Sequence, residues 1–430
     1  MLLSTFAQDR AFVTTWNTEN AGSATKTIVI PTTQFGTYAC TVDWGDGKTN
    51  YMTTYNDAAW THIYTSTGTY TVKIYGKFVG IVFNNTGDKL KLLTVQKWGP
   101  DFRIGTYQGA NFSGCTNLTI KATDVLNLLG TTSLYQAFGS CTSITTIPSI
   151  NQWDTSGIAS MSQTFKGCTS FNQNLTTFQT VNVTTMSDMF YGCTSFNGSV
   201  AGFNTENVTL MVGVFYNCSA FNQSVANFNT EKVTQMNSMF GNCTSFNQSV
   251  SNLNTALVTN MTSMFNGATA FNQSVSNFNT AKVTSMSTMF ANCAAFNQSV
   301  SSFDTALVTT TNSMFSGCTV FNQSVANFNT ANVTSMSSMF LNCVAFNQNV
   351  ATFTIAKVSA AISMFSGSGF KIANYNLLLN STTGWPSQAT ILSNVSFHAG
   401  TAHYSSGSPT TGRAFLTGTK LWTITDGGTP

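Results

Sequence analysis

Apolar residues in the middle of the chain follow a pattern that repeats every 25 residues between Phe171 and Phe370. Within each copy they fall at i, i+3, i+4 and i+7, which is the buried stripe of a short helix. In the copy that begins at Phe271, these residues are Met286, Met289, Phe290 and Cys293. Thr284 or Ser285 is placed to cap such a helix. The alternative is that the segment forms another extended side of a β-helix, and the periodicity favours the helix.

The rest of each repeat predicts an extended segment followed by a turn. From Phe296 to Phe303, β-type residues surround Gln-Ser-Val, and the Asn-Thr pair at 279–280 has turn chemistry. A unit of this size cannot bury its own apolar face and stacks on its neighbours instead. We therefore predict a leucine-rich-repeat-like solenoid of about eleven 25-residue units, with a parallel β-sheet and short helical turns. Repeated asparagines would form ladders in which each amide bonds the copies above and below, at Asn222, Asn247, Asn272, Asn297, Asn322 and Asn347.

The repeat is irregular where it begins and stops before the chain ends. Its Phe-x-x-Cys signature occurs at Phe112, Phe138 and Phe165, with spacings of 26 and 27 residues. We assign residues 100–374 to the solenoid and 375–430 to a C-terminal cap, which covers an end that would otherwise invite aggregation. Within the cap, residues 409–416 predict a short helix and residues 421–425 a last strand.

The N-terminal part predicts a short arm, residues 1–11, and a small β-sandwich, residues 12–99. Runs of β-branched and aromatic residues at 27–30, 37–43, 69–74 and 80–83 are bounded by Gly, Asn and Pro. The Val-Asp-Trp-Gly-Asp-Gly segment at 42–47 and the Trp-Thr-His-Ile-Tyr segment at 60–64 resemble the facing turn and strand of the PKD-like (polycystic-kidney-disease-repeat-like), immunoglobulin-type sandwich. Asp43 and Asp46 fit either calcium ligands or side chains that cap backbone donors in the turn, and we favour the turn.

Composition favours a packed, weakly charged protein. Charged residues make up only 7% of the chain, whereas 42% of residues are hydrophobic and 13% aromatic. This is enough apolar material for a core, and it does not match a disordered chain. The net charge of +3 is spread thinly, so we expect neither a nucleic-acid partner nor insertion into a membrane. The first ten residues do not read as a secretion signal, because Asp9 and Arg10 interrupt the apolar stretch.

Nine of the ten cysteines occupy one repeat position, which predicts a packing role. Side chains in register point the same way, which is poor geometry for a disulfide. Ala268 and Ser368 replace Cys at the same position, and small substitutes indicate a small buried slot. We therefore expect reduced thiols and no metal site. The nine are Cys115, Cys141, Cys168, Cys193, Cys218, Cys243, Cys293, Cys318 and Cys343.

No catalytic constellation is visible in the sequence. The nucleophile-elbow, phosphate-loop and zinc-protease motifs are all missing. His398, His403 and Asp426 can be drawn as a metal site, but their spacing alone is weak support. Charged residues are too sparse between Phe171 and Phe370 to build a glycosidase-type acid pair. We therefore expect no enzyme activity, no metal and no cofactor.

The repeat motif resembles a known family of surface proteins. Met-Phe-x-x-Cys-x-x-Phe-Asn-Gln together with Val-Thr-x-Met, from Phe112 to Phe370, looks like the BspA-like leucine-rich-repeat proteins. The similarity is to the 25-residue variety of repeat found in mycoplasma lipoproteins. This resemblance implies a binding protein on a cell surface or a virion, without enzyme activity. The chain departs from the lipoprotein members in showing no anchor, which argues against the bacterial cell surface as its location.

We predict a non-enzymatic, surface-displayed adhesion or receptor-binding protein, on a virion (as a phage fibre, spike or head decoration) or otherwise extracellular. Its expected partners are a host-surface glycan or protein, further copies of itself, and other virion or surface-assembly proteins through the N-terminal domain. The alternatives are a purely structural fibre, sheath or capsid building block, and a secreted bacterial adhesin whose signal peptide is missing. Candidate partner contacts are positions that vary between repeats: Leu257, Leu307, Glu231, Lys232 and Lys282. Surface drift in a turn is the plainer explanation of that variation.

Overall fold

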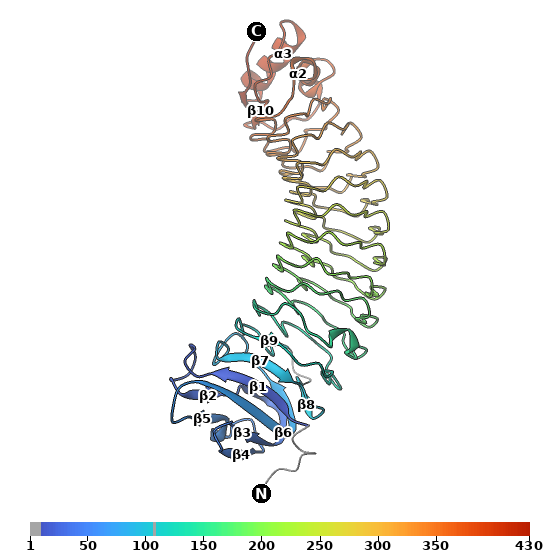
Figure 1. Ribbon diagram of the computed structural model, residues 1–430. Helices are drawn as coiled ribbons and strands as arrows, with labels where there is room; N and C mark the ends of the chain where they lie inside the picture. Colours follow the sequence, from blue (N-terminus) through green and yellow to red (C-terminus); the bar gives the residue numbers. More distant parts are fainter. Residues whose placement is uncertain (1–9, 106–108) are drawn as a thin grey trace. The chain divides into compact units, whose positions relative to one another are not determined.

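The computed structural model describes residues 10–105 and 109–430 (Figure 1). The chain forms two compact units, which we call the first and second unit. The first comprises Met1–Val208 and Asn217–Gln223, and the second comprises Thr209–Tyr216 and Ser224–Pro430. Of the predicted N-terminal arm, only Arg10 and Ala11 belong to the described residues.

The first unit begins with a mostly antiparallel sheet. Its longest strand, β6 (Thr69–Ile81), joins the two runs predicted at 69–74 and 80–83. Gly76 permits this continuity, because a Cβ there would lie 2.7 Å from the carbonyl oxygen of Ala39 on the neighbouring strand. The sheet extends past residue 99, and the predicted domain boundary there stays a prediction. Its strand order is β4 (Thr49–Met52), β3 (Thr32–Asp43), β6, β1 (Phe12–Asn17), β7 (Leu92–Lys97) and β9 (Thr119–Ile120), and β8 (Phe102–Arg103) pairs with β6.

A buried lysine holds a second, small sheet against this one. β2 (Thr27–Val29) pairs with β5 (Thr61–Ile63), which follows the 3-10 helix η1 (Ala58–Trp60). The Lys91 ammonium lies near the start of β2 and donates to four oxygens at 2.8–3.0 Å: the carbonyl oxygens of Ser23, Ala24 and Thr27 and the Ser23 hydroxyl. The Asp88 carboxylate lies 3.7 Å from the ammonium and accepts the Val29 N–H at 2.7 Å. Neither charged side chain is exposed to solvent.

The irregular repeats of the first unit stack through their phenylalanines. Successive ring centroids of Phe112, Phe138, Phe165 and Phe190 lie 5.5, 5.8 and 5.7 Å apart, with nearly parallel planes. The repeat with the longest spacing contains the 3-10 helix η2 (Ile150–Gln152), and Trp153 directly after it packs 6.0 Å from Phe138. The extra residues therefore form a local turn without interrupting the ring stack.

The predicted helix in the Met-x-x-Met-Phe segment is wrong, and the segment is a run of tight turns. In the second unit, the N–H groups of Met289, Ala291 and Cys293 each donate to the carbonyl three residues earlier. Thr288 has a φ of 54°, which a right-handed helix cannot accept. The intervening N–H groups donate to the next repeat at 2.6–3.3 Å: Met286 to Thr310, Thr288 to Asn312, Phe290 to Met314 and Asn292 to Ser316.

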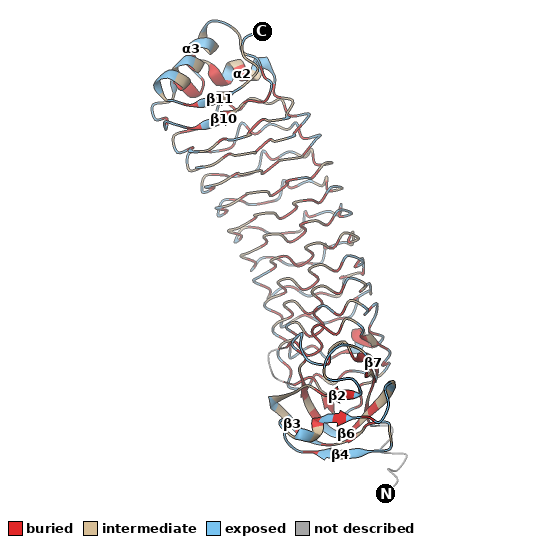
Figure 2. Cartoon of the chain, turned by 90° about the vertical axis from the view of Figure 1, so that its left-hand side faces the viewer, coloured by how far each residue is buried: buried red, intermediate tan, exposed pale blue. Residues whose placement is uncertain are grey.

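The inward positions of the repeat form the core of the second unit, as their apolar pattern predicts. Buried and exposed positions are interspersed along each turn (Figure 2). Ring centroids in the column that contains Phe290 lie 5.5–5.8 Å apart, within the usual range for aromatic pairs. The buried apolar residues from Val283 to Phe303 are Val283, Met286, Met289, Phe290, Ala291, Cys293, Phe296, Val300 and Phe303.

The predicted extended segment is not paired as a regular strand. Repeats of the second unit are joined by isolated parallel bridges through one residue each, as Ser285 bridges both Asn260 and Thr310. Side chains take the amides that a ladder would use: Asn297 N–H donates to the Asn272 side-chain oxygen at 3.0 Å, and Ser301 N–H to the Ser299 hydroxyl at 3.3 Å. The asparagine ladder therefore exists, but its rungs join a side-chain oxygen to a backbone N–H.

The second unit ends in a mixed α and β segment. The helix at 409–416 and the strand at 421–425 form close to their predicted positions. Trp385 and Phe397 pack against each other, and Phe397 also contacts the last ring of the column, Phe365. The elements are α2 (Ile372–Leu379), the 3-10 helix η3 (Trp385–Ser387), β10 (Ser396–His398), α3 (Ser408–Ala414), the π-helix η4 (Phe415–Thr419) and β11 (Thr423–Thr425), which pairs in parallel with β10.

A carboxylate joins the parts of this segment and gives it a pH dependence. Asp426 accepts from Arg413 Nε at 2.7 Å and from the Tyr375 hydroxyl at 2.6 Å. Burial raises the pKa of Asp426, but these hydrogen bonds outweigh burial and hold it below its usual value. A carboxylate whose pKa is lowered by folding stabilises the fold at pH values above its unfolded-state pKa. This contribution is lost as the pH falls through the folded-state pKa.

We therefore expect Asp426→Asn to lower the urea midpoint of the second unit at pH 7. The difference from the parent should shrink as pH falls below about 4, where the parent carboxylate also becomes protonated. Fluorescence of Trp385 and Trp422 follows the transition in variants that lack the other tryptophans. A difference of constant size from pH 7 to pH 3 would contradict this assignment.

Candidate functional site

The repeat cysteines are packing residues in the structure. All ten cysteines are buried and are present as thiols. Each thiol in the regular part donates to the carbonyl of a phenylalanine in the preceding repeat, for example Cys293 Sγ to Phe265 O at 2.9 Å. Ala268 fills the same slot and is also fully buried. Burial raises the pKa of Cys168 and of Cys343 to about 12, so the reactive thiolate is scarce at neutral pH.

This burial predicts that the native protein does not react with thiol reagents. We expect almost no colour from Ellman's reagent at pH 8, and the release of ten equivalents after denaturation in guanidinium. The number of reactive thiols is measured in the native and in the denatured protein, both without reducing agent. Rapid reaction of several thiols in the native state would place the cysteine column at the surface and contradict the assigned packing.

The candidate metal ligands serve structural roles. Asp43 and Asp46 accept the N–H groups of Gly45 and Lys48 at 3.0 and 3.1 Å, so the turn interpretation is confirmed. The second oxygen of Asp46 meets His62 Nε2 at 2.9 Å. His398 Nδ1 accepts the Gly400 N–H, and Asp426 is bonded as described above. Among residues 10–105 and 109–430, no group of three or more His, Cys, Asp or Glu side chains is arranged to hold a metal ion.

The five predicted contact residues lie in equivalent turns of successive repeats of the second unit. Leu257 and Leu307 are 39% and 51% exposed, and Glu231, Lys232 and Lys282 are also exposed. The buried threonine that precedes each turn fixes its position: for example, Thr280 Oγ1 donates to the Asp304 carbonyl at 2.7 Å. The structure thus brings these residues together along one edge, and their role in binding stays a prediction.

A larger surface of the second unit was missed by the reasoning from sequence. It is formed by four positions of the six repeats from Thr234 to Ser363, represented by Thr284, Ser285, Ser287 and Thr288, and we call it the hydroxyl face. The repeat before these six has Leu210, Val212 and Gly213 at three of the positions and is not part of the face. All of its positions are at least partly exposed. Apart from Ala360 and Ile362, its residues are Ser, Thr, Asn or Gln: Thr234, Gln235, Asn237, Ser238, Thr259, Asn260, Thr262, Ser263, Thr284, Ser285, Ser287, Thr288, Thr309, Thr310, Asn312, Ser313, Thr334, Ser335, Ser337, Ser338, Ser359 and Ser363.

Hydrogen bonds between the columns show that these residues share one surface. Gln235 Nε2 donates to Thr259 Oγ1 at 3.1 Å, which links the first two columns. Thr262 and Ser285 share a hydrogen bond at 2.7 Å, which links the second and third. In the fourth column, Ser263 and Thr288 share another at 2.7 Å. The face contains no ionisable side chain, and its exposed groups are hydroxyls and amides that donate and accept hydrogen bonds.

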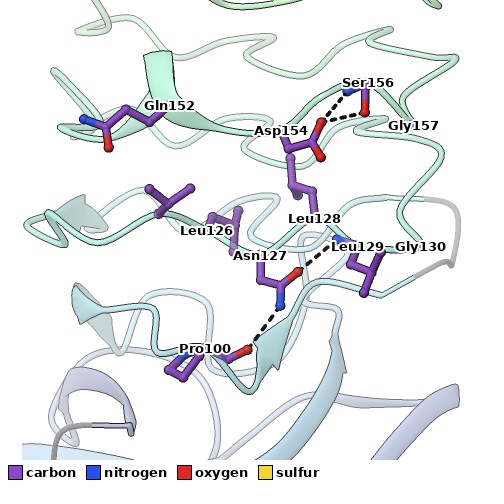
Figure 3. A pocket seen from close by; sticks show the side chains of 11 residues that line it. Pro100, Leu126, Asn127, Leu128, Leu129, Gly130, Gln152, Asp154, Ser156 and Gly157 are labelled. Atoms are coloured by element: carbon purple, nitrogen blue, oxygen red, sulfur yellow. Dashed lines mark hydrogen bonds between the residues drawn. The ribbon is translucent and has the colours of Figure 1, made fainter.

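A groove lies on the irregular repeats of the first unit (Figure 3). Its volume is about 460 Å³, and Leu126, Leu128 and Leu129 supply apolar walls. Asn127 is fixed by bonds to the Leu129 N–H and the Pro100 carbonyl. Among the described residues that line it, Asp154 is the one ionisable residue, and hydrogen bonds from Ser156 hold the pKa of this carboxyl below its usual value. A single carboxylate does not supply the acid pair of a glycosidase.

Comparison with known proteins places the repeats in one family. The family described as "Mycoplasma protein of unknown function, DUF285" matches residues 132–240, 213–310 and 275–378. No curated protein and no solved structure matches the chain significantly. Within the described residues, none of the helices has the length and apolar character needed to cross a membrane. The three overlapping matches together cover more than half of the sequence, and the chain belongs to the DUF285 family of mycoplasma-type repeat proteins.

Proposed function

We propose that this protein is a non-enzymatic adhesion or receptor-binding protein displayed on a surface. In this proposal the repeats form a BspA-like solenoid of about eleven units. A PKD-like domain precedes the solenoid and attaches it to a particle or to other assembly proteins. The address we favour is a virion, as a fibre, spike or head decoration. A secreted bacterial adhesin would bind by the same mechanism but at a different location.

The hydroxyl face is the observation that supports binding. It presents uncharged hydrogen-bonding groups at the same positions of six successive repeats, from Thr234 to Ser363. Weak contacts repeated in this way add up through avidity when the partner is also repetitive. The buried thiols, the bonded carboxylates and the sparse charge of the repeats supply no comparable support for catalysis in the described residues.

Binding of the purified, fluorescently labelled protein to intact candidate host cells tests the proposal. We expect saturable binding that excess unlabelled protein displaces, and immunogold labelling of particles from the same source. A labelled protein of similar size with a charged, globular surface serves as the control. Failure to bind any cell type on which the source particles or bacteria grow would contradict the adhesion proposal.

A second candidate is a structural building block that packs side by side. The exposed side chains of Leu257 and Leu307 on one edge of the second unit favour this role. In that case the protein should assemble as its concentration rises, and Leu257→Ser with Leu307→Ser should prevent assembly. Analytical ultracentrifugation of both proteins makes the measurement. A concentration-independent monomer would contradict the structural role.

A further inference from the structure

We propose that the hydroxyl face binds an extended, neutral polysaccharide that runs across successive repeats of the second unit. This inference rests on the proposed adhesion function and names its surface and partner class.

The fourth column of the face holds hydroxyl side chains where the backbone favours glycine. Ser238, Ser263, Thr288, Ser313, Ser338 and Ser363 have φ between 54° and 59°. Glycine adopts this left-handed conformation without strain, and the equivalent Gly213 does so with a φ of 57°. A β-branched residue such as Thr288 is an outlier there.

A second left-handed position in the same repeat shows the ordinary choice of residues. It is occupied alternately by asparagine and glycine, the residues that tolerate positive φ best: Asn242, Gly267, Asn292, Gly317, Asn342 and Gly367. In these six repeats the second position is therefore restricted to Gly and Asn, whereas Ser140 takes it in the first unit. Serine and threonine occupy the fourth column although the left-handed conformation strains their backbone. Backbone strain of this kind is concentrated at binding sites.

Two threonine columns make the same hydrogen bond but differ in regularity. On the hydroxyl face, Thr284 Oγ1 donates to the Thr259 carbonyl at 3.2 Å; elsewhere on the second unit, Thr269 Oγ1 donates to the Thr244 carbonyl at 3.2 Å. The latter column is interrupted by Ala294 and Val344, and the stack continues across both. The hydroxyl is therefore not required for stacking. On the face it is nevertheless unbroken: Thr234, Thr259, Thr284, Thr309, Thr334 and Ser359.

The direction of the hydrogen bonds defines the chemistry of the partner. Each hydroxyl of the first column donates its hydrogen to a carbonyl of the preceding repeat, at 3.1–3.4 Å. Its oxygen keeps lone pairs that can accept hydrogen bonds, as Thr259 Oγ1 does from Gln235 Nε2. A partner must therefore supply many hydrogen-bond donors. It must also be uncharged, because the face has no charged side chain to neutralise a charge on the partner. The hydroxyl groups of a neutral polysaccharide meet both conditions.

The spacing of the repeats favours a long chain over a single sugar. Bridged backbones lie about 4.8 Å apart, so equivalent acceptors recur at that interval over six repeats. The hydrogen bonds between columns hold these acceptors in place before binding, which lowers the entropy lost on association. Affinity should therefore increase with the length of the polysaccharide.

The experiment uses the full chain and a variant that folds without strain. In Ser263→Gly, Thr288→Gly and Ser313→Gly combined, glycine removes three hydroxyls at positions whose φ it accepts. The matched control, Thr269→Ala with Thr319→Ala, removes two hydroxyls from the interrupted column, where Ala294 is natural. Circular dichroism melting should place both variants within a few degrees of the parent. Binding is measured by affinity electrophoresis in gels that contain mannan, galactan, soluble β-glucan or, as the anionic contrast, alginate.

We expect at least one neutral polymer to retard the parent and the control equally, with retardation that is insensitive to salt. The triple glycine variant should bind about tenfold more weakly, because three of several additive contacts are lost. Unchanged binding by this variant, or retardation by alginate alone, overturns the inference.

Cell binding separates this inference from the proposed function. If cells bind the parent and the glycine variant equally, a protein receptor is used and only the polysaccharide assignment fails. The same conclusion follows if protease treatment of the cells abolishes binding of both proteins. If the parent binds no cells, the adhesion proposal itself fails.

Discussion

Lys91→Met is expected to destabilise the first unit by about 3–5 kcal/mol, because it leaves the Asp88 carboxylate buried without its partner. The ammonium also donates to the carbonyls of Ser23, Ala24 and Thr27, and a methionine side chain cannot replace these hydrogen bonds. Methionine keeps the length of the lysine stem, so the loss reports the charge and its hydrogen bonds. Urea unfolding followed by the fluorescence of the tryptophans in the first unit makes the measurement.

Lys89→Met is the matched control for this prediction. Lys89 is two residues away, and its ammonium bonds Asn85 at an exposed position. Its replacement should change the free energy of unfolding by less than about 0.5 kcal/mol. Lys91→Met combined with Asp88→Leu removes the lone charge as well, and should lose less than the sum of the two single variants. A loss below about 1 kcal/mol in Lys91→Met alone would show that the pair contributes little.

The repeat period and the inward residues of the core were predictable, because a side chain that must be buried recurs at a fixed interval. The local conformation of the Met-x-x-Met-Phe segment was not. Three tight turns in succession bury residues at i, i+3, i+4 and i+7, as a helix does, so the pattern at Met286 to Cys293 does not distinguish them. The residue that breaks the helix is Thr288, whose type gives no signal of a positive φ.

The hydroxyl face was missed for a related reason. Its residues lie 25 apart in sequence and become neighbours only when the repeats stack, and constant positions such as Thr284 had been assigned to helix capping. The sequence instead predicts contacts at the varying positions Leu257 and Leu307, and both side chains are exposed. The signal that could have identified the face is the absence of glycine and alanine from most of its positions. That signal has meaning only once the backbone conformation is known.

Phe290→Ala is expected to destabilise the second unit by about 3–5 kcal/mol, because it opens a cavity in the middle of the ring column. The Phe290 ring lies 5.7 Å from Phe265, 5.8 Å from Phe315 and 4.2 Å from Phe296, and it is fully buried. Hydrogen exchange measured by mass spectrometry should show the largest loss of protection in the repeats on either side. Leu257→Ala, which truncates an exposed side chain, should change stability by less than about 0.5 kcal/mol.

The response to Phe290→Ala also tests how the repeats are coupled. In a stack where each repeat contacts only its neighbours, stability is a sum of repeat and interface terms, and a weak interface separates the parts on either side of it. Urea unfolding of the variant should therefore split into two transitions, and Trp385 and Trp422 should report only the C-terminal one. A single transition with an unchanged slope and a uniformly lower midpoint would contradict this. The second unit would then unfold as one cooperative body, and neighbour contacts alone would not account for its stability.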